Sequence, residues 1–110
     1  MKRKIKTYGG YFERFLKTLL PKELVKLNSI ISLLETSDRM PVKFMKYVRD
    51  GLYELRIEYE SNIYRVFFIF DDDCIVVLFN GFQKKTQKLP KNEVNKALKI
   101  KEEYYADKRP

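Results

Sequence analysis

The chain has 110 residues, of which 45% are hydrophobic and 35% are charged, so it is long enough for one domain with its own core and too short for two. Lysine and arginine number 23 against 15 aspartate and glutamate residues, a formal net charge of +8, and a small domain with this charge attracts nucleic acids or acidic proteins. Histidine is absent, which excludes histidine-dependent catalytic triads and histidine metal sites, and the single cysteine excludes an internal disulfide.

The first third of the chain predicts a short strand followed by two helices. Residues Lys4 to Tyr8 alternate charged and less polar side chains, and the Gly9-Gly10 pair ends this strand. Apolar residues then recur at helical spacing, and Pro21 can begin a second helix at its first turn. The residues that carry this spacing are Phe12, Phe15, Leu16, Leu19 and Leu20, then Leu24, Leu27, Ile31 and Leu34. The pattern indicates a helical hairpin with one apolar face to bury.

The remaining residues predict an irregular stretch, three strands and a final helix. Residues 37–50 are expected to be irregular and basic, and Asp50-Gly51 indicates a turn into a strand. Three β-rich runs follow, LYELRIEY, IYRVFFIF and CIVVLFNGF, separated by the short loops ESN and DDD. Such short loops are typical of an antiparallel meander. Pro90 can begin the last helix, which the spacing predicts to end near Tyr104 or Tyr105.

The order strand, two helices, three strands, helix predicts a single α+β domain over residues 1–110, with helices stacked on a mostly antiparallel sheet. No apolar stretch approaches the roughly 20 residues of a membrane span. The charged N-terminus is not followed by the apolar segment of a signal peptide. We therefore expect a cytoplasmic protein without a membrane partner.

Two arginines stand out in the strand region, because Arg56 and Arg65 are its only positive residues between positions 51 and 79. A charge in a central apolar strand costs free energy unless it is paired or opens into a cleft. If the loop between the two strands has an even length, the two arginines are neighbours on one face of the sheet. They would then form a phosphate clamp. The structural alternative is that Arg65 pairs with Glu54 or Glu58 across the sheet.

Further basic and aromatic residues are candidates for RNA binding. The lysines that directly follow the last strand are Lys84, Lys85 and Lys88, and the irregular stretch contributes Lys43, Lys46 and Arg49. Tyr47, Tyr59 and Phe82 lie nearest to these basic segments, and aromatic rings stack on unpaired bases. The alternative is that the lysines only solvate a surface loop.

Three segments in the right order and at the right spacing resemble a known family. They are the GLYELR turn and strand, the YRV strand with its arginine, and GFQKKTQKLPKNE before the last helix. The chain resembles the phage Gp49-like branch of the RelE/HigB toxins, which is part of the RelE/ParE superfamily. The resemblance runs from about Lys46 to Tyr105, and it implies a RelE-like toxin domain of a type II toxin–antitoxin system.

The resemblance implies a ribosome-dependent endoribonuclease that cuts messenger RNA in the ribosomal A site and inhibits translation, with neither metal nor cofactor. Arg56 and Arg65 correspond to basic positions of the first two meander strands, and Lys84 and Lys85 to basic positions after the last strand. We expect the arginines to hold the phosphate and Lys84 or Lys85 to act as the base, since neighbouring lysines favour loss of a proton. Glu54 is the alternative base. Replacing Arg65 by alanine is expected to abolish growth inhibition and to leave the fold intact.

The resemblance also implies a partner, a helix-turn-helix antitoxin whose acidic segments cover the basic face. Two other functions stay open on the same fold. One is a gyrase inhibitor of the ParE type, which poisons its target by protein binding. The other is a catalytically inactive module that binds RNA or a protein.

Overall fold

The computed structural model describes residues 2–108 and confirms the expected α+β class. In chain order the elements are β1 (Lys4–Thr7), α1 (Tyr11–Leu16), α2 (Pro21–Thr36), β2 (Met45–Arg49), β3 (Leu52–Tyr59), β4 (Asn62–Phe70), β5 (Ile75–Lys84) and α3 (Lys91–Lys108). The strands form one sheet in the order β1-β5-β4-β3-β2, in which β1 and β5 are parallel neighbours and the other three neighbouring pairs are antiparallel. The expected meander is β3, β4 and β5, and the expected helical hairpin is α1 and α2.

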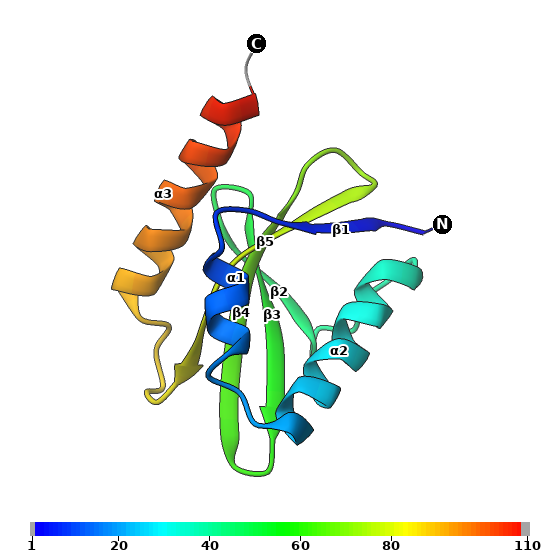
Figure 1. Ribbon diagram of the computed structural model, residues 1–110, viewed down its shortest axis with the longest axis vertical. Helices are drawn as coiled ribbons and strands as arrows, with labels where there is room; N and C mark the ends of the chain where they lie inside the picture. The colour runs from blue at the N-terminus through cyan, green and yellow to red at the C-terminus, as the bar shows by residue number, and fades with distance from the viewer. Residues whose placement is uncertain (1, 109–110) are drawn as a thin grey trace.

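Helices cover both faces of the sheet (Figure 1). On one face, α1 and α2 pack through Phe12, Phe15, Leu27, Ile30 and Leu34 against Leu55, Val66, Phe68 and Leu78. On the other face, α3 packs through Val94, Ala97, Ile100 and Tyr104 against Leu52, Phe67, Ile69, Val77 and Phe79. Because β4 is central, successive residues of it enter opposite cores, which explains why this strand is apolar on both faces.

The expectation of an irregular stretch over residues 37–50 was wrong for its last part, since Met45–Arg49 form the edge strand β2. The Asp50-Gly51 turn has positive φ angles of 50° and 78°, as in the two-residue hairpin turns that join antiparallel strands. The turn therefore places β2 antiparallel to β3. The side chains of β2 are half-buried or exposed, so the strand lacks the apolar alternation that marks a half-buried strand in a sequence.

The loop between β3 and β4 has the even length that brings the two arginines together. Tyr59 pairs with Asn62, which leaves a loop of two residues, and this register places Arg56 directly opposite Arg65. Directly opposed residues of an antiparallel pair point to the same face of the sheet. The hairpin therefore holds both guanidinium groups on one side of the sheet.

A glycine in β5 lets α1 approach the sheet closely. A Cβ atom added to Gly81 would lie 2.4 Å from the ring of Phe15, well inside van der Waals contact. Phe15 is only 6% exposed, so its ring has little room to move away. Gly81 and Phe15 thus fix the position of α1 against β5.

Replacing Gly81 by alanine is expected to lower the free energy of unfolding by about 1–3 kcal/mol, because an added methyl overpacks this contact. Urea denaturation of the parent and the variant measures the difference. Shortening the partner in the variant Gly81→Ala/Phe15→Leu should recover part of the loss. A Gly81→Ala variant that unfolds at the parent's urea midpoint would show that α1 adapts freely.

A buried carboxylate fastens the end of α3 to the turn after β4. Asp71, which is 8% exposed, accepts hydrogen bonds from the Tyr104 hydroxyl at 2.5 Å and the Lys108 ammonium at 2.7 Å. The hydrogen bond from Lys108, followed by that from Tyr104, holds the pKa of Asp71 below its usual range. Burial and the bond to Asp71 raise the pKa of Tyr104 to about 12.

The lowered pKa of Asp71 predicts how the free energy of unfolding depends on pH. Because the pKa of Asp71 is lower in the folded chain, its stabilisation is complete above the ordinary aspartate value of about 4 and is lost as the pH falls toward the folded value. Thermal unfolding followed between pH 7 and pH 2 should therefore depend on pH less steeply in Asp71→Asn than in the parent. Identical acid profiles for the two proteins would exclude this role for Asp71.

Candidate functional site

The sheet face that contacts α3 is only partly covered by that helix. Phe67 and Ile69 of β4 lie beneath α3, and Arg65 lies on the same face because residues two apart on a strand share a side. The β3–β4 hairpin extends well beyond α3 (Figure 1). The register pairs Arg65 with Arg56 and Phe82, and pairs Ile63 with Lys84. These charged side chains therefore gather on the part of the face that no helix covers.

Two adjoining hollows are formed here, and together we call them the basic cleft. The larger has a volume of about 630 Å³ and is lined by Lys26, Lys43, Phe44, Arg56, Ile57, Glu58, Ile63, Arg65 and Lys84. The smaller has a volume of about 380 Å³ and is lined by Lys46, Tyr47, Val48, Glu54, Arg56, Arg65, Lys84, Gln87 and Leu89. Arg56, Arg65 and Lys84 line both hollows, so the three predicted cations do converge. Cations outnumber carboxylates in the lining, which favours an anionic ligand.

Arg65 forms a buried ion pair with Glu54, as the structural alternative predicted. Its Nε lies 3.2 Å from Glu54 Oε2, and the two side chains are only 6% and 8% exposed. The two atoms are not aligned for a hydrogen bond, so charge attraction holds the pair, while Nη1 of Arg65 donates to the Tyr64 carbonyl at 3.1 Å. Burial lowers the pKa of Arg65 and the nearby Glu54 carboxylate opposes that effect. A guanidinium keeps its proton under these conditions, and the pair forms a charged floor beneath the cleft.

Arg56 and Lys84 stand above this floor and are half-buried. Among residues 2–108, neither of these cations takes part in an ion pair. Arg56 is held through its backbone N–H, which donates to the Phe44 carbonyl at 2.7 Å. Lys84 donates from Nζ to the Gln87 carbonyl at 3.0 Å, which ties it to the loop after β5. Both charges therefore face the cleft with capacity for an anion.

The structure brings some of the predicted RNA-binding residues into the cleft and leaves others outside. Lys43 lines the larger hollow, and Lys46 and Tyr47 line the smaller one. Arg49 lies at the far end of β2, where it is exposed and pairs with Asp50 at 2.9 Å. It does not line the basic cleft, and neither does Lys88, which is exposed in the loop after β5.

Lys85 and Phe82 lie beside the cleft rather than in it. Phe82 packs on Phe67 with ring centroids 5.5 Å apart, which leaves it half-buried. Lys85 is exposed and lines two neighbouring hollows on the other side of β5. Lys84 and Lys85 both line the hollow at the end of β5, but only Lys84 also lines the basic cleft, because side chains alternate along a strand.

Among the residues of the cleft that sequence reasoning missed are Lys26 and Gln87. Lys26 reaches it from α2, on which its helical position gives no sign of a role. Gln87 lines the smaller hollow and also fixes Lys84 through its carbonyl. The cluster GFQKKTQK contains Gln87, so its position near the lysines was visible, but the backbone contact was not.

The acidic residues that the structure describes form no recognisable metal centre. In the part of the chain that the structure describes, no group of three or more cysteine, aspartate or glutamate side chains is arranged to hold a metal ion. Within the same residues, no helix has the length and apolar composition to cross a membrane.

Comparison with known proteins identifies the family. A family model described as "Phage derived protein Gp49-like (DUF891)" matches residues 14–102, a range that contains α2, β2 to β5 and the whole basic cleft. A search of curated proteins gave no significant match. The matched family is toxin-like, which is compatible with the toxin of a toxin–antitoxin pair. The chain belongs to the Gp49-like family of phage-derived proteins.

Proposed function

We propose that this protein is a toxin that cuts messenger RNA on the ribosome and thereby stops translation. The observation that carries the proposal is the convergence of Arg56, Arg65 and Lys84 on one cleft. Two of these cations stand free of ion pairs above the buried Arg65–Glu54 pair, within the described residues. Planar guanidinium and ammonium groups suit a phosphate.

The residues of the cleft can serve each step of a transesterification. The ribose 2′-hydroxyl gives its proton to a base and attacks the neighbouring phosphorus, while the bond from phosphorus to the 5′-oxygen breaks and that oxygen gains a proton. The products are a 2′,3′-cyclic phosphate and a 5′-hydroxyl. Arg56 and Lys84 hold the non-bridging oxygens as negative charge develops on them. Arg65 acts as a positioning residue, since its burial keeps it beneath the cleft.

Glu54 is the base that the geometry favours, because its carboxylate lines the smaller hollow and is oriented by Arg65. Lys84 stays the alternative base, whereas Lys85 faces other hollows. Lys46 suits the protonation of the leaving 5′-oxygen, because it lies opposite Glu54 on the same face of the sheet and lines the smaller hollow. Tyr47 suits it less, since its ring packs on Tyr53 and its hydroxyl accepts a hydrogen bond from the Gly51 N–H at 3.1 Å.

A toxin of this kind needs an antitoxin, and the charge of the cleft indicates what that partner presents. The chain carries a net charge of +8, so an acidic segment that enters the cleft would be attracted and would exclude RNA. We propose a helix-turn-helix antitoxin that covers the cleft in the cytoplasm, where translating ribosomes are found.

Induced expression in a bacterial host tests the proposal. We expect growth to stop and primer extension to show new 5′ ends within translated messengers, with untranslated RNA left intact. Messengers that stay whole while chromosomal DNA breaks would instead identify a gyrase inhibitor of the ParE type. A host that grows normally despite abundant folded protein would identify an inactive module.

A further inference from the structure

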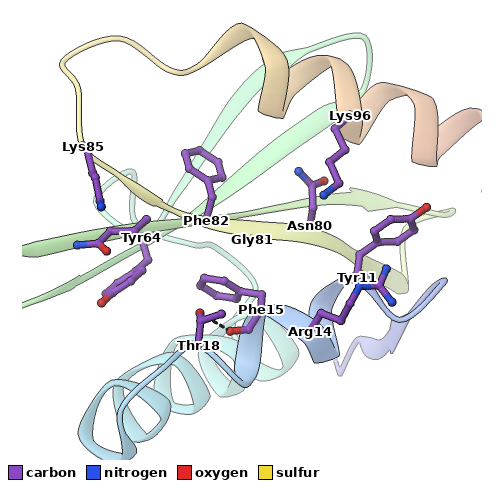
Figure 2. A pocket seen from close by; sticks show the side chains of 11 residues that line it. Tyr11, Arg14, Phe15, Thr18, Tyr64, Asn80, Gly81, Phe82, Lys85 and Lys96 are labelled. Carbon is purple, nitrogen blue, oxygen red and sulfur yellow. Dashed lines mark hydrogen bonds between the residues drawn. The ribbon is translucent and has the colours of Figure 1, made fainter.

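One of the two hollows that Lys85 lines lies along the edge of β5, outside the basic cleft. β1 pairs with β5 only from Ile75 to Leu78, although β5 continues to Lys84. The later part of β5 is flanked by α1 on one side and α3 on the other, and Figure 2 shows this hollow, with Lys96 reaching toward β5 from α3. It has a volume of about 490 Å³, within the usual range of small-molecule sites. We call it the edge hollow.

The lining of the edge hollow is cationic and aromatic. Arg14, Lys85 and Lys96 contribute charge, the half-buried Tyr11 and Phe82 contribute rings, and no acidic side chain lines it in the described part of the chain. Cζ of Arg14 lies 4.9 Å from the centroid of the Tyr11 ring, and Nζ of Lys96 lies 5.7 Å from it. This combination suits a nucleotide, because the cations attract its phosphate and its base can stack on an aromatic ring.

A buried amide in the lining has an acceptor without a partner. Asn80 is 2% exposed, and its Nδ2 donates to the carbonyl and the carboxylate of Glu93 at 3.3 Å and 3.2 Å. These two oxygens fix the orientation of the amide, since the reverse orientation would oppose oxygen to oxygen. Oδ1 of Asn80 has no hydrogen-bond partner. Buried acceptors are almost always paired, so a ligand that offers an N–H group would complete this one.

A further hollow lies between the edge hollow and the basic cleft and shares lining residues with each of them. Gln83 and Lys85 line both the edge hollow and this further hollow at the end of β5. Lys84 lines the further hollow and the basic cleft. A row of hollows with basic lining residues therefore runs from the cleft, around the end of β5, to the edge hollow.

We propose that the edge hollow is a second RNA subsite, which holds a nucleotide of the same strand whose scissile phosphate lies in the basic cleft. The proposal rests on the proposed function. Asn80 Oδ1 accepts a hydrogen bond from an N–H group of the base, which all four RNA bases offer, so the subsite is expected to hold a nucleotide with little preference among bases. An added protein strand fits less well, because the ladder between β4 and β5 shifts register between Val66 and Phe68 beside this edge, and such irregularities disfavour strand addition.

Two lysines of α3 provide a matched test. Lys96 lines the edge hollow, and Lys99 is exposed one turn further along the helix without lining it. The affinity of each alanine variant for a 5′-labelled single-stranded RNA of twelve nucleotides is measured by fluorescence anisotropy across a salt series. We expect Lys96→Ala to bind more weakly and to lower the salt slope by about 0.7, the value for one lost phosphate contact on a single strand. Lys99→Ala should match the parent.

The variants Arg56→Ala and Lys84→Ala separate the inference from the proposed function. If they bind RNA more weakly while Lys96→Ala matches the parent, the edge hollow holds no nucleotide and the proposed function stands. If all three variants match the parent, the RNA site as a whole is wrong. If Lys96→Ala changes the binding of the antitoxin and not of RNA, the edge hollow belongs to a protein partner and the inference is overturned.

Discussion

Replacing Arg56 by alanine is expected to lower the rate of messenger cleavage by about 10²- to 10³-fold, the usual effect of removing one group that stabilises developing negative charge. The side chain lines both hollows of the basic cleft and, within residues 2–108, forms no ion pair, so its loss should leave the fold unchanged. The measurement is primer extension on a reporter messenger after induction, with colony growth as the second readout. Arg56→Lys keeps the charge but loses the planar pair of donors, so an intermediate rate is expected.

Arg49 offers the matched control for this experiment. It is an arginine on the neighbouring strand β2, its side chain is 61% exposed, and its partner is the adjacent Asp50. Exposed pairs of this kind contribute little to stability, and Arg49 does not line the cleft. Arg49→Ala should therefore stay as toxic as the parent. Equal toxicity of Arg56→Ala and Arg49→Ala, at equal protein levels, would refute the assignment of Arg56.

Replacing Arg65 by alanine is expected to destabilise the protein by about 3–5 kcal/mol, because the change leaves Glu54 charged and buried without its partner. The sequence led us to expect an intact fold in this variant. In the structure the Arg65 side chain is only 6% exposed and is paired with Glu54, so we now expect a loss of stability. Glu54→Ala should cost a similar amount. Removing both charges in Arg65→Ala/Glu54→Ala should cost less than the sum of the single losses. Urea denaturation of the four proteins completes the cycle.

The cycle also separates a structural role from a direct role in RNA binding. A coupling between the two sites of about 0.5–3 kcal/mol is typical of residues in contact. If the losses of free energy of unfolding were simply additive, the two side chains would act independently, and Arg65 would be open to a phosphate. Arg49→Ala serves again as the reference, with an expected change within about 0.5 kcal/mol.

Several features of the fold and the cleft could be predicted because they depend on local pattern. The alternation in LYELRIEY and the short ESN loop were enough to predict that Arg56 and Arg65 would share a face if the loop had an even length. The structure shows a loop of two residues and the direct pairing of Arg56 with Arg65. The helices were predictable for the same reason, since their apolar spacing reflects the face that they bury.

Other features depend on contacts between distant residues, which a single sequence does not show. The burial of Arg65 requires knowing that β4 is the middle strand of five. The side chains of β2 are half-buried or exposed, so that strand lacks an apolar pattern. The edge hollow combines Arg14 of α1, Asn80 of β5 and Lys96 of α3, and no spacing along the chain relates these three.

The parallel pairing of β1 with β5 has a consequence for how the protein is made. Lys4 pairs with Ile75 and Thr7 with Leu78, so the first strand leaves the ribosome long before its partner does. The β3–β4 hairpin needs only nearby residues and can form earlier, because local contacts close with the smallest loss of chain entropy. During synthesis the N-terminal strand is therefore made before β5 can pair with it, and the protein gains its complete sheet only when translation of its own messenger is well advanced.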